Sequence, residues 1–169
     1  ISAYAFAGCT ALESFTFNNN LVYIGWNAFG GNPWLNNGDW IIRQDKLYLY
    51  AASYNAAIVP DGVTSIIDGA FSTGAARFAV FMTATPPAAG SGAFAGVEAV
   101  LVPYEYLNAY KAAWPQHASV IKGYTYLDGA LYYENTLVYY EGGLGELRVP
   151  EFVNGFAITE IADRAFAGH

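Results

Sequence analysis

The chain has 169 residues, of which 54% are apolar and only 12% charged, and its formal net charge is -7. This length fits one compact domain or a short section of an extended array, and the dispersed Lys and Arg residues give no basic face for a phosphate backbone, so we expect no nucleic-acid partner. The longest uncharged runs are interrupted by Asn, Gly or Pro residues, so we expect no membrane insertion in this segment.

A short apolar motif recurs from one end of the chain to the other. The letters AFAG occupy residues 5–8, 93–96 and 165–168, and the variant AFGG occupies residues 28–31. An Ile stands at the same place before the Phe in the pairs Ile1/Phe6, Ile24/Phe29, Ile66/Phe71 and Ile161/Phe166. The interval from Phe6 to Phe29 is the same as that from Phe71 to Phe94. A fixed period of this length is typical of repeat architectures.

One such period is too short to enclose a core, but it can complete one turn of a coil that contains a short strand and a return segment. Stacked coils build a parallel sheet and a continuous interior, in which every coil adds an equivalent side chain to each row. We therefore predict an interior row of five side chains: Phe6, Phe29, Phe71, Phe94 and Phe166. The Gly that comes after the Phe in the motif permits a sharp bend.

Two β-hairpins are predicted between groups of coils, over residues 40–50 and 126–140. Apolar and aromatic runs flank the plausible turns at residues 44–46 and 134–136. Residues 46–60 and 136–150 also align with each other without a gap. The hairpins therefore belong to a second and longer repeat.

A helix is predicted over residues 104–114, because Leu107, Tyr110 and Trp114 have helical spacing and lie between two prolines. Three blocks then emerge along the chain. Residues 1–39 hold the repeat coils of a first block. Residues 40–122 hold a β-hairpin and repeat coils closed by the helix, and residues 123–169 hold a β-hairpin and the start of a further repeat block, which we expect to be truncated.

The sequence carries no recognisable reaction centre, so we expect no enzymatic activity, no catalytic residue, no cofactor and no metal site. Nucleophilic catalysis needs a base beside a Ser or Cys, and the chain offers only His117 and His169. Zinc sites need clustered Cys and His residues, which two isolated histidines cannot supply. The single cysteine, Cys9, is expected to be a buried and inert thiol.

The abundant aromatic residues allow two interpretations. The first is an exposed contact surface, for which the candidates are Tyr48, Tyr50, Tyr132, Tyr139, Trp34 and Trp40. Tyr and Trp side chains bring large contact areas at low entropic cost. The second is that alternate residues of each hairpin pack on the coils. Strand alternation should turn some of them outward, because the run LYLY at residues 47–50 cannot bury all four side chains on one face.

Several segments together carry a resemblance to a known family. They are residues 3–15 (AYAFAGCTALESF), 24–35 (IGWNAFGGNPWL) and 58–71 (IVPDGVTSIIDGAF). In addition, residues 100–115 (VLVPYEYLNAYKAAWP) look like the helical segment that often closes a run of repeats of this kind. Over most of its length the chain resembles the BspA-like leucine-rich repeats of bacterial surface proteins. The resemblance implies a leucine-rich-repeat-like right-handed solenoid, mostly β with short parallel strands, with inserted β-hairpins and one or more short helices.

The same resemblance implies a function. It suggests a non-enzymatic protein-interaction or adhesion module of an extracellular or cell-surface bacterial protein, with a host or neighbouring-cell surface protein as its partner. The extended sheet face of a solenoid suits a large partner of this kind. Two alternatives stay open: a carbohydrate-binding or ancillary region of a larger exported enzyme, and a passive surface spacer.

Overall fold

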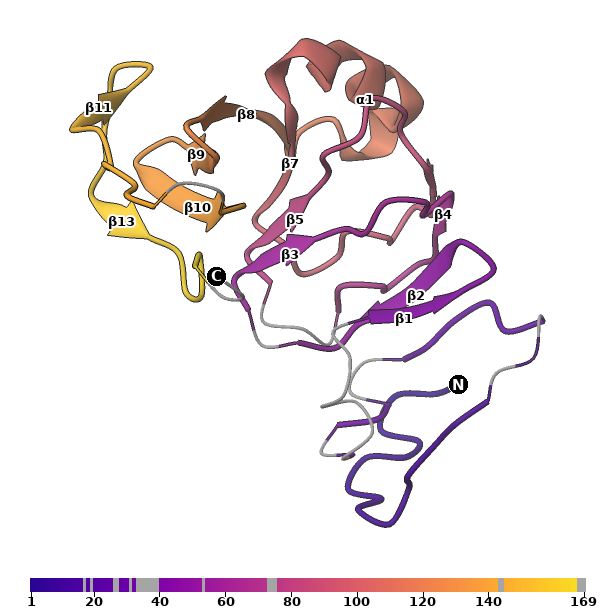
Figure 1. Cartoon of the computed structure of the whole chain (residues 1–169). Helices are drawn as coiled ribbons and strands as arrows, with labels where there is room; N and C mark the ends of the chain where they lie inside the picture. The colour runs from indigo at the N-terminus through magenta and orange to yellow at the C-terminus, as the bar shows by residue number, and fades with distance from the viewer. Residues whose placement is uncertain are drawn as a thin grey trace.

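The computed structural model describes residues 1–16, 18, 20–25, 28–30, 32, 40–52, 54–72, 76–142 and 145–166. Over these residues the chain is mostly β and has one short α-helix, α1 (Leu107–Ala113), between the 3-10 turns η2 (Tyr104–Tyr106) and η3 (Pro115–His117). Figure 1 shows the coils in the centre of the molecule, with α1 along one side and the last strands of the chain as a separate group beyond them. None of the described helices is long and apolar enough to span a membrane.

The described strands form three sheets. The four-stranded sheet has the order β1-β2-β4-β6 and consists of β1 (Trp40–Arg43), β2 (Lys46–Tyr50), β4 (Ser65–Ile66) and β6 (Ala88–Ala89). The seven-stranded sheet has the order β13-β10-β9-β8-β7-β5-β3 and consists of β3 (Ala56–Ile58), β5 (Phe78–Val80), β7 (Ala99–Pro103), β8 (Ile121–Leu127), β9 (Ala130–Tyr133), β10 (Thr136–Tyr140) and β13 (Glu160–Ile161). The third sheet is a small hairpin of β11 (Phe152–Val153) and β12 (Phe156–Ala157).

The period in the sequence is a period in space. In the seven-stranded sheet, Ala56 lies opposite Phe78, about one period later, and Phe78 lies opposite Ala99, about one period later again. In the four-stranded sheet, Ser65 lies opposite Ala88, which is also one period later. All of these pairs are parallel, so each coil contributes one strand to each of the two sheets. This arrangement is consistent with a leucine-rich-repeat-like fold.

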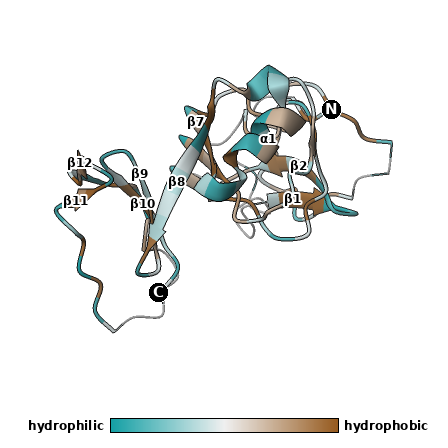
Figure 2. Cartoon of the chain, turned by 90° about the horizontal axis from the view of Figure 1, so that it is seen from above, coloured by the Kyte–Doolittle hydropathy of each residue, from teal (hydrophilic) through white to brown (hydrophobic). Residues whose placement is uncertain are grey.

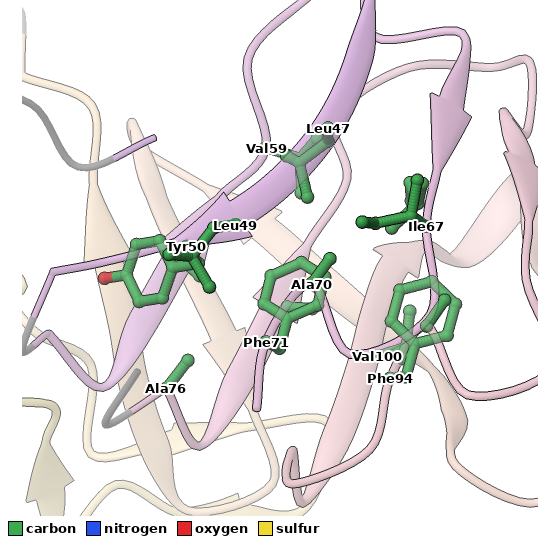
Figure 3. Close-up of a cluster of buried hydrophobic side chains, with 14 of the residues drawn as sticks. Leu47, Leu49, Tyr50, Val59, Ile67, Ala70, Phe71, Ala76, Phe94 and Val100 are labelled. Atoms are coloured by element: carbon green, nitrogen blue, oxygen red, sulfur yellow. The ribbon is translucent and has the colours of Figure 1, made fainter. Parts of the chain in front are cut away.

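The predicted row of phenylalanines is confirmed for the central coils. The side chains of Phe29, Phe71 and Phe94 are buried, with exposed fractions of 0%, 1% and 5%. Phe6 stacks on Phe29 at 5.3 Å between ring centroids, and Phe71 stacks on Phe94 at 5.8 Å, as Figure 3 shows for the second pair. Phe166 departs from the row, because it is 40% exposed and lies against Tyr140 at the sheet edge formed by β13. No described coil covers its outer side.

Both predicted hairpins are present. β1 and β2 pair antiparallel around a turn in which Gln44 and Asp45 have left-handed φ values of 49° and 61°. β9 and β10 also pair antiparallel. The expected first strand of the second hairpin is in fact two strands, because the chain turns back at Asp128 and Gly129, whose φ values of 51° and 77° fit a tight two-residue turn.

The second strand of each hairpin takes the place of a coil. The Tyr50 amide donates to the Ala70 carbonyl at 2.7 Å, and the Tyr140 amide donates to the Ala165 carbonyl at 2.8 Å. The Phe6 amide makes the same bond to Ala28 at 2.7 Å in the first coils. Tyr50 and Tyr140 therefore occupy the phenylalanine position of the row, and the longer repeat in the sequence is a structural equivalence. A hairpin strand thus precedes the coils that carry Phe71 and Phe166.

The predicted helix over residues 104–114 is observed as η2 followed by α1. Three side chains from this region each contact a main-chain carbonyl of the last coil, and in each case the carbonyl lies 27 positions earlier in the chain. The Tyr110 hydroxyl donates to the Thr83 carbonyl at 2.9 Å, the Trp114 indole N–H donates to the Pro87 carbonyl at 2.7 Å, and Nε2 of His117 lies 2.8 Å from the Gly90 carbonyl. The helical segment thus covers the end of the coil stack.

The expected burial of Cys9 is wrong, because the structure exposes this residue. Asn32 holds the equivalent place in the next coil, shortly after the phenylalanine, and it is buried with an exposed fraction of 1%. Its side-chain N–H groups donate to the Phe6 and Phe29 carbonyls, each at 2.7 Å. The coil that carries Phe6 covers Asn32, whereas in the described chain no coil precedes the one that carries Cys9.

Two contacts tie the C-terminal strands to the coil stack. Arg77, immediately before β5, donates to Glu98 at 2.8 Å and to Glu160 of β13 at 2.6 Å. The Arg164 guanidinium lies 4.5 Å from the centre of the Tyr54 ring. Exposed ion pairs contribute little to stability, so we regard these contacts as aligning the two parts of the seven-stranded sheet.

Candidate binding groove

A groove of about 1130 Å³ opens beside β8. Its lining comes from residues 103–106 at the end of β7 and in η2, residues 122–126 of β8, residues 132–134 in and after β9, and residues 153, 154 and 156 of the β11–β12 hairpin, with Met82 and Glu141 completing it. We call this the β8 groove. It is a concave site to which several separate parts of the chain contribute, which is the usual form of a binding site.

The groove exists because β8 changes partner along its length. Its first half pairs parallel with β7, from Ile121 to Tyr124. Its second half pairs antiparallel with β9, from Thr125 to Leu127. β7 ends at Pro103, where the chain turns into η2, so none of the described strands continues along this side of β8. Figure 2 shows β8 crossing between the coil stack and the C-terminal strands.

Exposed aromatic rings form the rim of the groove. Tyr104 is 74% exposed, Phe156 50% and Tyr126 47%. Gly123 lets the Tyr104 ring lie close to the backbone of β8, because a Cβ atom at this glycine would stand 2.6 Å from a Tyr104 ring carbon. Tyr104 is thereby held against the strand while most of its surface faces solvent.

One lining residue of the groove, Tyr132, carries a buried hydroxyl. Tyr132 has an exposed fraction of 2%, and its hydroxyl has no hydrogen-bond partner among the described residues. Burial raises the pKa of this hydroxyl, and nearby Asp128 raises it further. An unpaired buried polar group costs about 1–3 kcal/mol. Next to it, Asn154 donates to the Thr125 hydroxyl at 2.5 Å and so fastens the β11–β12 hairpin to β8.

The charges in the groove are mainly negative. Glu105, Glu134 and Glu141 line it, and Lys122 is its only cationic lining residue among those described. A hydrogen bond to Glu141 raises the pKa of Tyr126 to about 12, with a smaller contribution from desolvation. Burial raises the pKa of Tyr133 to about 12, reinforced by Glu134. These phenols are therefore neutral at physiological pH, and the carboxylates set the sign of the local charge.

The tyrosines predict a loss of stability in alkali. Burial raises the pKa of Tyr124 to about 12, with further contributions from neighbouring Tyr110 and Glu105. In the unfolded chain a tyrosine ionises near pH 10. Below pH ~10 both states keep the proton, so the contribution of Tyr124 is constant. Between pH ~10 and ~12 the unfolded state alone releases it, and the free energy of unfolding should fall by up to roughly 3 kcal/mol.

Denaturant unfolding at several pH values would measure this effect, with Tyr124→Phe as the comparison. The variant should lose less stability than the native chain over the same alkaline range. Equal slopes for the two proteins would contradict the assignment to Tyr124.

The six predicted contact residues differ in how deeply the structure buries them. Tyr48, Tyr50 and Tyr132 are buried, which favours the packing interpretation for them, and Tyr132 lines the β8 groove. Trp40 and Tyr139 are half-buried. Trp34 lies outside the described residues. A contact role for these six residues stays a prediction.

Three of these residues meet at a second and smaller pocket. Trp40, Tyr50 and Tyr139 line a space of about 210 Å³, together with Arg164 and Tyr54. The coil stack and the C-terminal strands therefore both contribute to this pocket. The expectation that β2 turns some side chains outward is wrong for residues 47–50, because all four are buried in one apolar cluster and both faces of the strand are covered.

The exposed rim of the β8 groove is not among the residues that the sequence analysis singles out. From the sequence, Tyr104 is predicted only as the start of a helix, and Tyr126 only as the start of a hairpin strand. The available signal is the alternation of Tyr124 and Tyr126 on a strand that directly follows a helix. Among the described residues, no group of His, Cys, Asp and Glu side chains is arranged to hold a metal ion.

Comparison with known families decides the classification. Residues 1–97 match the model of a BspA type leucine-rich repeat region of six copies. The chain belongs to this family. BspA-type leucine-rich repeat proteins are repeat proteins associated with protein interaction, are generally non-enzymatic, and are typically bacterial surface or secreted proteins. No curated protein matches the chain.

The BspA-type match also locates the groove relative to the repeats. It ends at Val97, just before β7 begins. Among the described lining residues of the β8 groove, only Met82 lies within the matched segment. The described part of the groove is thus built almost entirely by residues that follow the matched BspA-type segment.

Proposed function

We propose that this chain is a non-enzymatic protein-interaction module of a bacterial surface or secreted protein, that it adheres to a protein of a host or neighbouring cell, and that its coils form a right-handed solenoid. The family provides the general role, since BspA-type repeats are associated with protein interaction. The β8 groove supports the specific role, because Tyr104 there is 74% exposed and held against the backbone of β8. Exposed aromatic anchors of this kind dominate binding energies in protein interfaces.

The three blocks are part of the same proposal. Residues 1–39, 40–122 and 123–169 each act as one structural unit, and the second and third begin with a hairpin that supplies the first strand of its stack. The equivalent bonds of Tyr50 to Ala70 and of Tyr140 to Ala165 support this division. The groove then lies where the second block meets the third.

A carbohydrate-binding role is the second candidate. The Tyr104 ring offers a large exposed face beside the carboxylate of Glu105. Stacking of an aromatic ring with hydrogen-bonding groups around it also suits a sugar ring. The passive-spacer alternative predicts no saturable binding at all.

Whole-cell binding by the purified chain separates these possibilities. We expect saturable binding to host or bacterial cells that disappears when the cells are treated with protease and survives treatment with glycosidases. Tyr104→Ala should weaken this binding about tenfold or more, as expected for a hot-spot residue. The matched control is Val22→Ser, since Val22 is also 74% exposed but lies in the first coils.

The opposite enzyme sensitivity would support carbohydrate binding instead. An absence of saturable binding to every cell type would support the spacer. Equal effects of Tyr104→Ala and Val22→Ser would show that the groove is not the binding site.

A further inference from the structure

We infer that the β8 groove binds an extended polypeptide segment rich in Lys or Arg, which adds to the free edge of β8 as a strand in continuation of β7. This inference rests on the proposed function, because it names the chemistry of the partner at the same site. Three independent features carry it: the backbone of β8, the charge of the groove and the buried hydroxyl of a lining tyrosine.

The first feature is the direction of the main-chain groups of β8. The Val100 amide of β7 donates to the Val120 carbonyl at 2.9 Å, so the even-numbered residues of this segment direct their polar groups toward β7. The next even-numbered residue beyond the end of β7 is Tyr126. The N–H and C=O groups of Tyr126 therefore point toward the edge of β8 that lies beyond the end of β7.

The second ladder of β8 gives the same direction for Tyr126. Leu127 and Ala130 close the two-residue turn at Asp128 and Gly129, so they form the hydrogen-bonded pair of that hairpin. The adjacent pair, Tyr126 and Leu131, is then the non-hydrogen-bonded pair, and the polar groups of Tyr126 face away from β9. An edge of this kind is a template for an added strand, with main-chain bonds giving affinity and side-chain pockets giving specificity.

The second feature is charge complementarity. A strand placed beside Tyr126 would pass between η2 and the β11–β12 hairpin, through a space lined by Glu105, Glu134 and Glu141. Lys122 is the only described cation in this lining. Carboxylates attract Lys and Arg side chains, and Arg and Lys also bind the faces of aromatic rings such as Tyr104. An acidic segment would be repelled.

The third feature is the Tyr132 hydroxyl. Tyr132 lines the groove, and its hydroxyl is buried and has no partner among the described residues. A bound segment that presents a carbonyl or hydroxyl group to it would satisfy this hydrogen-bonding group. The groove is therefore a built site with a polar group that a ligand would complete.

Peptide titration against the purified chain tests the inference. The probe is a short peptide that alternates Lys or Arg with Val and Thr, and the comparison is the same peptide with Glu in place of each basic residue. Isothermal titration should show saturable binding of the basic peptide, weakened by added salt, and no binding of the acidic one. Methylation of the backbone amides on one set of alternate residues should weaken binding about tenfold, whereas methylation of the other set should have little effect, because successive residues of a strand bond to opposite sides.

Side-chain variants test the location. Glu105→Gln should weaken peptide binding several-fold, whereas Glu13→Gln, which makes the same charge change at an exposed site in the first coil, should leave it unchanged. Tyr132→Phe should leave the melting temperature of the free chain equal or higher, because the lost hydroxyl is buried without a described partner, and it should weaken peptide binding several-fold.

Four outcomes would overturn the inference: no binding of the basic peptide, equal effects of methylation at both sets of amides, equal effects of Glu105→Gln and Glu13→Gln, or binding of neutral oligosaccharides that is lost in Tyr104→Ala. Failure here is distinguishable from failure of the proposed function. If protease-sensitive cell binding persists and still depends on Tyr104, the interaction module stands and the strand-addition mode alone is lost.

Discussion

Replacing Trp114 with alanine is expected to lower the free energy of unfolding by about 3–5 kcal/mol, the usual cost of removing a buried Trp side chain. The exposed fraction of Trp114 is 1%, and its ring lies within 5.3 Å of the rings of Phe81, Phe94 and Tyr110, measured between centroids. The substitution also leaves the Pro87 carbonyl without its donor. Chemical denaturation of both proteins would give the difference.

Trp114→Phe separates packing from hydrogen bonding at this site. It retains an aromatic ring but removes the N–H, so it should cost about 1–3 kcal/mol, the usual penalty for an unpaired buried acceptor. If Trp114→Ala leaves the unfolding midpoint unchanged, the helical segment does not close the coil stack. The segment would then be an appendage rather than part of the core.

Replacing Phe71 with alanine is expected to cost about 3–5 kcal/mol. Phe71 is 1% exposed, and its ring contacts three others: Phe94 from the next coil, and Tyr50 and Trp40 from the first hairpin. The alanine would leave a cavity in the middle of the row, where the coils on both sides prevent collapse. Figure 3 shows Phe71 between Tyr50 and Phe94.

Phe166→Ala is the matched control, because Phe166 holds the same place in its coil but is 40% exposed. It should cost clearly less than Phe71→Ala, since part of the Phe166 ring already contacts solvent and less apolar surface changes its environment. Similar losses for the two variants would mean that the row does not provide the stability of the stack, and that the sequence repeat has another cause.

The repeated part of the fold could be predicted from the sequence because a coil stack converts spacing along the chain into position in space. Phe29, Phe71 and Phe94 are buried for this reason, and Tyr50 and Tyr140 align with them through the longer repeat. The helix was predictable from local spacing between two prolines. These features depend on neighbours that are close in sequence or related by one period.

The groove could not be predicted, because it depends on where one strand stops and another takes over. Nothing in residues 121–127 marks the change from β7 to β9, and Tyr124 and Tyr126 alternate as they would in any strand. The prediction for Cys9 fails for a related reason. Its motif matches the repeat, but burial at that position requires a preceding coil.

The hairpins have a consequence for how such a chain changes over evolutionary time. Tyr50 and Tyr140 join the row through a main-chain donor that is the same as the one Phe6 uses, although their strands come from hairpins. Because this bond joins main-chain atoms, it does not depend on the side chain, and packing in the row requires only a ring of suitable size. A whole unit can therefore be gained or lost by recombination while its neighbours keep their contacts. The length of the molecule can therefore change by whole units.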